Sequence, residues 1–132
     1  MTLERSRELV LRHDEGWNAQ DLDAVMACYH DEIVFHNHNA GEVAEGAAAV
    51  RAHIGTIFAG WPDLRFRRRR LFVAEPFAVS EWTATATHRD GRRLEWDGVD
   101  VFPMRDGLIA RKDVYSTAHA ARVLDAPTME AP

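Results

Sequence analysis

An aspartate within an apolar strand pattern is the residue of this sequence best suited to chemistry. Asp100 stands between Val99 and Val101, in a run of apolar and aromatic residues over 96–104. A buried carboxylate is costly unless it is paired, hydrogen-bonded or used in a reaction. If Asp100 points into an aromatic pocket, its carboxyl can stay neutral near pH 7 and act as a hydrogen-bond donor or general acid.

His13 is the second candidate for proton transfer. It precedes Trp17 by four residues on a predicted helix, so both side chains can face one cavity. If His13 touches Asp100, the carboxylate orients the imidazole and raises its basicity, which makes His13 the general base. Asn37 would then supply a hydrogen bond. The alternative is that Asp100 and His13 are structural groups with fixed partners.

Strand alternation suggests which other residues line the pocket. If Asp100 faces inward, Trp96 and Phe102 do as well. On the preceding strand we expect Glu81 to face inward and Trp82 outward, and on the last strand Asp113 and Tyr115 share a face. An aromatic pocket with few polar groups is typical of a small-molecule site. The predicted pocket residues are Trp17, Phe35, Phe58, Trp61, Glu81, Trp96, Phe102, Asp113 and Tyr115.

Other chemistries find less support. His36 and His38 share a strand face, but a metal would need a third ligand such as His53 or Glu42. Alternation places both histidines opposite Asn37, so we predict that they face solvent or the pocket mouth and bind no metal. The sequence has no glycine-rich phosphate loop and no nucleophile motif, and we expect no cofactor.

The predicted elements are helices followed by strands. Helices are expected over 3–18, from an Asp21 cap through Tyr29, over about 46–58 and over 117–124. Strands are expected over 33–38, 64–73, 77–88, 93–104 and 108–115, with Asp-Gly turns at 90–91 and 106–107. This is an α+β pattern, in which a curved sheet wraps around the helices and leaves a conical cavity open at one end. Residues 126–132 are expected to form a frayed tail.

Composition limits the classes of function. With 132 residues, 46% of them hydrophobic, the chain suits one soluble domain. The net charge of −5 argues against nucleic-acid and membrane partners, and no apolar run approaches the roughly 20 residues of a membrane span. The basic run 65–70 is interpreted as a solvated edge or as salt bridges across a dimer. The single cysteine, Cys28, suits the reducing cytoplasm.

Several short segments, taken in order, resemble the nuclear transport factor 2-like superfamily, in particular its SnoaL-like polyketide cyclase and ketosteroid isomerase branch. The matching segments are 17–25, 45–51, 61–64, 81–88, 98–102 and 106–115. The resemblance implies one domain over 1–125, a cone-shaped curved antiparallel or mixed sheet wrapped around N-terminal helices, as in a cystatin-like α+β roll. It also implies a homodimer formed through the outer sheet face.

The resemblance also implies roles for individual residues. Asp100 falls at the oxyanion-hole aspartic acid of the isomerases, a position that resembles the catalytic histidine of the cyclases. His13 falls at the isomerase's oxyanion-hole tyrosine. Asn37 replaces its general-base aspartate, and an amide cannot abstract a proton, so the isomerase route is not expected. In the epoxide hydrolases an asparagine of this strand holds water, but their Arg-and-two-Asp arrangement is not evident here. The cyclases' acidic residue of the last strand aligns with Val114, next to Asp113.

The expected function is cofactor-independent acid–base chemistry of the isomerase, cyclase, dehydratase or epoxide-hydrolase type. The expected partner is a small apolar molecule such as a polyketide-like or cyclic compound. The alternative that the sequence leaves open is a non-catalytic ligand-binding or dimerisation module of the same fold.

Overall fold

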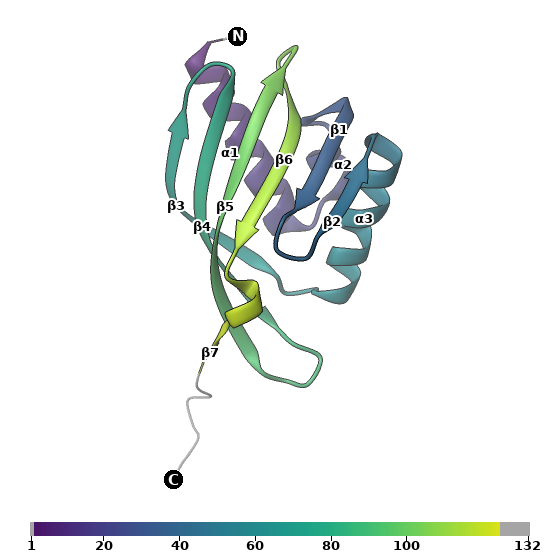
Figure 1. Ribbon diagram of the computed structural model, residues 1–132, viewed down its shortest axis with the longest axis vertical. Coiled ribbons are helices and arrows are strands. Elements are labelled where there is room, and N and C mark those ends of the chain that lie inside the picture. Colours follow the sequence, from purple (N-terminus) through teal and green to yellow (C-terminus); the bar gives the residue numbers. More distant parts are fainter. Residues whose placement is uncertain (1, 125–132) are drawn as a thin grey trace.

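Helices from the N-terminal half pack against one face of a curved, mixed sheet of seven strands (Figure 1). The computed structural model describes residues 2–124. The helices are α1 (Leu3–Ala19), α2 (Leu22–Met26) and α3 (Ala47–Gly60). The strands are β1 (Tyr29–Asn37), β2 (Glu42–Glu45), β3 (Arg65–Val73), β4 (Phe77–Thr87), β5 (Arg93–Arg105), β6 (Leu108–Ser116) and β7 (Arg122–Leu124). The predicted α+β class is confirmed.

Local sequence explains where the first two helices begin. The Thr2 hydroxyl accepts a hydrogen bond from the backbone N–H of Arg5 (3.1 Å), and the Asp21 carboxylate accepts one from Ala24 (3.1 Å). Each of these oxygens satisfies a backbone donor that has no partner inside the helix. The helical period then turns one stripe of α1 toward the sheet. The buried residues of that stripe are Ser6, Leu9, Val10, His13, Gly16 and Trp17.

The strand order places β6 and β5 at the centre of the sheet. The hydrogen-bonded order is β2-β1-β6-β5-β4-β3, with β7 pairing with β5. Strands β3 to β6 form an antiparallel meander, and β1 joins it parallel to β6. Asp106 (φ 55°) and Gly107 (φ 77°) form the tight turn between β5 and β6 that the Asp-Gly pair predicts. The inner faces of β5 and β6 therefore lie in the middle of the sheet, opposite the helices.

Cross-strand register corrects the predicted facing of β4. Trp82 pairs with Gly98, and directly opposed residues of an antiparallel pair point to the same face. Glu81 pairs instead with Val99 and lies on the outer face, where its carboxylate binds Arg70 (2.5 and 3.0 Å). The prediction that Glu81 faces inward was wrong. Alternation shows which residues share a face, but it cannot say which face is inside.

Gly98 makes room for the inward-facing Trp82. A Cβ atom on Gly98 would lie only 2.2 Å from Cη2 of the Trp82 ring, far inside van der Waals contact. The indole therefore lies directly over the glycine backbone of the neighbouring strand. This close approach requires glycine, because any larger residue would push the ring away.

The C-terminal end differs from the predicted helix over 117–124. Ala118–Ala120 form one 3-10 turn, and the chain then continues as β7, which pairs with the first residues of β5. Arg122 stabilises this pairing through hydrogen bonds to Glu95 (2.9 Å) and Asp97 (3.0 Å). The short edge strand β2 was not predicted, because its four residues carry no clear apolar alternation. The predicted tail over 126–132 lies outside the described residues.

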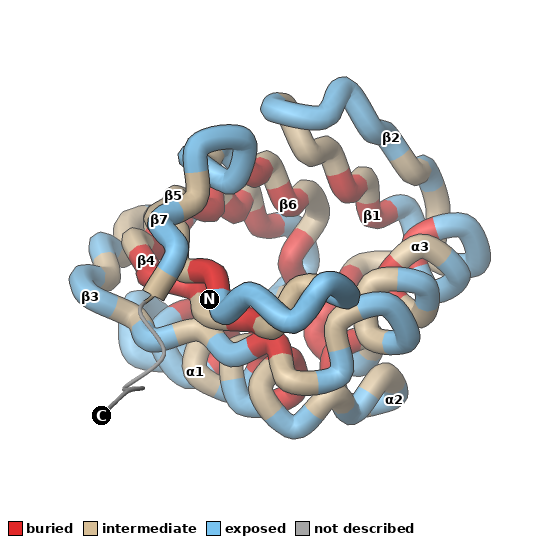
Figure 2. Tube along the Cα trace, turned by 90° about the horizontal axis from the view of Figure 1, so that it is seen from below, coloured by how far each residue is buried: buried red, intermediate tan, exposed pale blue. Residues whose placement is uncertain are grey.

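Buried residues cluster where the sheet and the helices face each other (Figure 2). The largest side chains with almost no exposure include Phe102 and Ile109 from the central strands, with Leu9 from α1 and Ile54 from α3. Within residues 2–124, no helix has the length and apolar character needed to cross a bilayer.

Replacing Gly98 with alanine tests the Trp82 packing. The added methyl group must displace the ring, so we expect Gly98→Ala to lower the free energy of unfolding by about 2 kcal/mol in chemical denaturation. Gly60→Ala is the matched control, since no atom lies within 4 Å of the Cβ position there. Equal stability of the two variants would contradict the packing described.

Candidate active site

An aromatic cavity of about 400 Å³ lies between the helices and the inner face of the sheet. All four tryptophans of the chain line it, although they come from distant parts of the sequence: α1, the residue after α3, β4 and β5. The polar lining includes Asn37, Asp100 and Lys112. Its aromatic lining consists of Trp17, Phe35, Trp61, Phe66, Trp82 and Trp96. Large ring surfaces with few polar groups are suited to binding a flat, mostly apolar molecule.

Asp100 lies where the open cavity meets the closed core. Along β5, Leu94 and Trp96 line the cavity, whereas Phe102 is fully buried beyond it. The Asp100 carboxyl is 5% exposed and belongs to the cavity lining. The prediction that Asp100 points inward, among aromatic residues, agrees with this geometry.

The charged partner of Asp100 is Lys112. The Lys112 Nζ lies 3.8 Å from Oδ2 of Asp100, and the lysine is only 4% exposed. The ammonium also lies over the ring of Trp17, 3.8 Å from its centroid, with Phe35 at 5.3 Å. Electron-rich ring faces and a carboxylate therefore replace the water that the lysine loses on burial.

Burial moves the pKa values of this pair toward each other. It raises the pKa of Asp100 to about 6, a rise that Lys112 partly opposes. It lowers the pKa of Lys112, and this shift is opposed by Asp100 and by the more distant Asp14. Both shifts follow from the loss of solvation of the charged forms. Near neutral pH, Asp100 can thus both give and take a proton.

Two buried polar atoms near the pair have no hydrogen-bond partner among residues 2–124. They are Oδ1 of Asp100 and the indole Nε1 of Trp82. The indole N–H nevertheless lies close enough to lower the pKa of Asp100 slightly. A buried donor and acceptor left unsatisfied are costly, and in a pocket such atoms are available to a ligand.

His13 is not part of this pair. Its Nε2 lies 2.9 Å from the Tyr29 hydroxyl and its Nδ1 lies 3.1 Å from Asp14. The dyad that would form if His13 touched Asp100 is therefore absent from these hydrogen bonds, and His13 has the fixed structural partners of the alternative. Burial and the Lys112 charge lower the pKa of His13 to about 4, so the ring is neutral at pH 7.

The hydrogen bonds around His13 form a directed chain. The Trp17 indole donates to the Tyr29 oxygen (3.3 Å), which leaves the Tyr29 hydroxyl to donate to Nε2 of His13. The neutral ring then carries its proton on Nδ1 and donates to Asp14, which also binds Arg68. This chain holds the Trp17 ring in place beneath Lys112. His13 thus positions the pocket wall.

The other predicted pocket residues are divided between the cavity and the rest of the molecule. Asn37 lines the cavity, as do Trp17, Phe35, Trp61 and Trp96. Phe58 packs edge-on against Trp17, with 5.2 Å between ring centroids, and is outside the lining. Phe102 is sealed in the core, 5.0 Å from the His13 ring.

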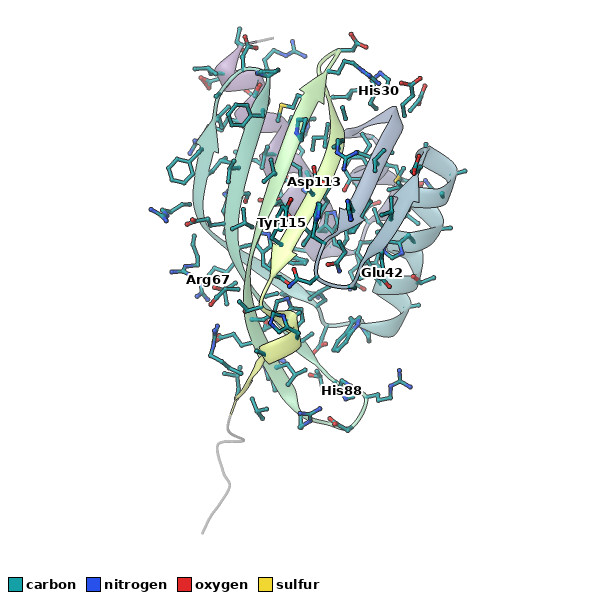
Figure 3. The ribbon with its side chains drawn as sticks, in the orientation of Figure 1. His30, Glu42, Arg67, His88, Asp113 and Tyr115 are labelled. Carbon is teal, nitrogen blue, oxygen red and sulfur yellow. The ribbon has the colours of Figure 1, made fainter. Side chains whose placement is uncertain are left out.

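Asp113 and Tyr115 point away from the pocket. Figure 3 shows both on the side of β6 opposite α1, where Asp113 binds Arg111 (2.9 Å) and Tyr115 stacks on His38 (4.2 Å). Their assignment to the pocket was wrong. The register pairs Val114 with Asp100, so Val114 and Lys112 occupy the inner face of β6.

Lys112, Trp82 and Phe66 are among the pocket residues that sequence reasoning missed. Lys112 stands between Arg111 and Asp113, so it resembles part of a charged surface strand. One signal could have singled it out, because it is the only lysine among sixteen basic residues. For Trp82 the signal was Gly98, because a glycine inside a strand often marks the close approach of another group.

His36 and His38 face outward. The third possible metal ligand beside them is Asp113, and not His53 or Glu42. His36, His38 and Asp113 place one ligand atom each within 4.8 Å of one another, whereas His53 and Glu42 lie close to each other elsewhere. Both Asp113 oxygens already bind Arg111 and one of them also binds His38 (2.9 Å). A cation at this place would have to displace the arginine.

The basic run on β3 makes ion pairs within the chain. Arg68 binds Asp14, Arg70 binds Glu81, and Arg69 lies 3.7 Å from Asp97. These pairs belong to one chain and need no partner. They partly compensate the charge of a partly exposed strand.

Sequence comparison identifies the family. The model of the SnoaL-like domain matches residues 10–112, so the chain belongs to the SnoaL-like family of the nuclear transport factor 2-like superfamily. This range includes α1 from Val10 onward and both Asp100 and Lys112. No curated protein matches the chain significantly in sequence.

Solved structures of similar fold have different described functions. A putative polyketide cyclase from Xanthomonas campestris pv. campestris is 20% identical (TM-score 0.81; 89% of this chain and 93% of that one). AclR, a putative hydroxylase from Streptomyces galilaeus, is 20% identical (0.74; 87% and 80%). A hypothetical protein with a ketosteroid isomerase-like fold from Catenulispora acidiphila DSM 44928, in complex with trimethylamine, is 13% identical (0.75; 82% and 84%). These similarities establish the fold and leave the reaction to the residues of the pocket.

Carboxyl-carbon NMR of Asp100 tests the electrostatics of the site. Because burial raises its pKa to about 6, we expect its signal to titrate with a midpoint near pH 6, and the midpoint to rise further in Lys112→Met. Lys112→Arg keeps the positive charge and should keep the midpoint below that of the methionine variant. Asp97, whose pKa is lowered to about 2 by Arg122 and Thr83, is the internal control and should not titrate.

The raised pKa of Asp100 also determines how the free energy of unfolding changes with pH. The ordinary Asp pKa lies below that of folded Asp100, so the folded state holds more protons between about pH 4 and 6. The contribution of Asp100 to the free energy of unfolding therefore falls as the pH rises through this window. An Asp100 midpoint near pH 4 would contradict the buried environment.

Proposed function

We propose that the chain is an acid–base enzyme that acts without a cofactor on a small, mostly apolar ring compound of polyketide-like character. The observation that carries this proposal is the Asp100–Lys112 pair, which is buried at the wall of an aromatic cavity. A carboxyl with a pKa of about 6 is well matched to proton transfer near neutral pH. Membership of a family with described polyketide cyclases agrees with an isomerase, cyclase, dehydratase or epoxide-hydrolase type of reaction.

Each group at the cavity wall has a role in the proposed reaction. Asp100 donates a proton to the substrate or removes one from it. Lys112 stabilises the negative charge that develops on a substrate oxygen, in a site where water is largely excluded. Asn37 supplies a further hydrogen bond, and the tryptophan rings hold the flat substrate. His13 remains neutral and keeps Trp17 in place.

Binding without turnover is the alternative function. It is favoured by the pairing of Asp100 with Lys112, because each charge already has an opposite charge beside it within the protein. A reducing compartment, the cytoplasm, suits either function, because Cys28 is buried and unpaired. The two functions differ in the role of the Asp100 carboxyl. Its loss would lower the turnover of an enzyme, whereas a binding protein has no turnover to lower.

A ligand screen followed by Asp100→Asn tests the proposal. Ring compounds that fill the cavity should raise Tm through linkage, and mass spectrometry of the incubated mixtures should identify a product. We expect Asp100→Asn to lower turnover by about 10² or more, because a general acid–base contributes that much, while the Kd changes less than tenfold. Glu81→Gln on the outer face is the control and should retain full activity. Unchanged turnover in Asp100→Asn would exclude the proposed role.

We also propose that the outer sheet face forms a homodimer. Large apolar side chains are exposed on it, including Phe72 (51%), Phe77 (43%) and Tyr115 (47%), and apolar groups of this kind favour burial against a partner. In analytical ultracentrifugation, Tyr115→Glu should weaken the dimer at least tenfold. Leu3→Glu changes an equally exposed apolar residue on α1 and should not. A monomeric wild-type chain at high concentration would rule the dimer out.

A further inference from the structure

The cavity contains the only lysine of the chain. The fifteen other residues of the Lys and Arg set are arginines, and within 2–124 Lys112 is the only buried member of that set. Arginine keeps its proton under all ordinary conditions, whereas lysine can lose it and become a nucleophile. The one side chain able to form a carbon–nitrogen bond with a carbonyl group is therefore the one placed at the cavity.

The surroundings of Lys112 leave its amine free to react. Its distance of 3.8 Å to Asp100 is too long for a hydrogen bond, and its other near neighbours are the ring faces of Trp17 and Phe35. Lys112 also belongs to the cavity lining, so a ligand in the cavity can reach it. A flat ligand held against the aromatic walls would present its substituents to this amine.

We propose that Lys112 captures the aldehyde or ketone group of a bound ring compound as an imine, with Asp100 as the proton carrier. This inference rests on the proposed function of the pocket, names the substrate class as a carbonyl compound, and gives Lys112 a covalent role in place of the stabilisation of charge. The Nζ lone pair forms a bond to the carbonyl carbon while the C=O π bond breaks, and the oxygen accepts a proton from the Asp100 carboxyl. Asp100 takes one proton from Nζ and gives it to the carbinolamine hydroxyl, which leaves as water as the nitrogen lone pair forms the C=N bond. The product is a protonated imine beside the Asp100 carboxylate.

The electrostatics of the pair favour this reaction. Burial disfavours both the ammonium and the carboxylate, which lowers the pKa of Lys112 and raises that of Asp100. Proton transfer from Lys112 to Asp100 therefore costs less in the cavity than in water, and it produces the free amine and the neutral acid together. The groups that face the amine are Asp100 from β5, Trp17 from α1 and Phe35 from β1, with Asp14 at longer range.

Reductive trapping tests the inference directly. The full chain is incubated near neutral pH with benzaldehyde, cinnamaldehyde or naphthaldehyde and sodium cyanoborohydride, and the adducts are located by peptide mass spectrometry. Only two kinds of amine can react, Lys112 and the N-terminus, so the N-terminus is an internal reference. We expect at least one of these aldehydes to label Lys112 at least tenfold faster than the N-terminus.

Three variants give the controls. Lys112→Met and Lys112→Arg should lose the internal adduct and keep the N-terminal one. Asp100→Asn should slow labelling of Lys112 at least tenfold while the N-terminal rate stays unchanged. In the denatured wild-type chain, the preference for Lys112 should disappear, because both amines are then solvated.

The possible failures are distinguishable from one another. If naphthalenemethanol, which cannot form an imine, raises Tm while every aldehyde labels only the N-terminus, the inference is wrong and the pocket proposal stands. If no ring compound binds and Lys112 stays unlabelled, both proposals are wrong. Labelling of Lys112 at an unchanged rate in Asp100→Asn would remove Asp100 from the mechanism.

Discussion

The burial of two opposite charges side by side constrains the whole cavity. Removing an ammonium or a carboxylate from water costs several kcal/mol for each group, and the charges of Lys112 and Asp100 each offset part of that cost for the other. Their meeting requires β5 and β6 to pair in the register that places Asp100 opposite Val114, two residues from Lys112 on the same face. The aromatic faces above the amine are a second requirement, because they replace water around a charge that the carboxylate contacts from one side only.

The hydrogen bonds that link Trp17, Tyr29 and His13 hold an aromatic ring in place above the Lys112 amine. Trp17 can stabilise Lys112 only if its ring keeps one orientation, and its N–H is held by Tyr29. Tyr29 depends in turn on a neutral His13, and the neutral state is favoured by the same burial and by the nearby lysine charge. The charged pair and the neutral network are therefore coupled, so a change in one alters the environment of the other.

The reaction that a protein of this fold can catalyse depends on which side chains lie on the inner face of the central strands. Proteins of closely similar backbone are described as a putative polyketide cyclase and a putative hydroxylase, so the sheet and helices alone do not determine a reaction. In this chain, Gly98 admits the Trp82 ring, the ring lines the cavity together with Asp100, and the only lysine of the sequence, Lys112, lies at the cavity wall. These few side chains carry the functional proposals.

The sequence by itself determined the features that depend on local interactions. The cap at Asp21, the Asp106-Gly107 turn and the α+β order all follow from neighbouring residues or from simple periodicity. Only the tertiary structure decided which face of β4 and β6 is inside. Alternation has two equivalent solutions for each strand, and only pairing with β5 distinguishes them. For this reason Glu81, Asp113 and Tyr115 were placed wrongly. The charged neighbours of Lys112 suggest a surface residue, and only the pairing of the strands shows that it is buried at the cavity.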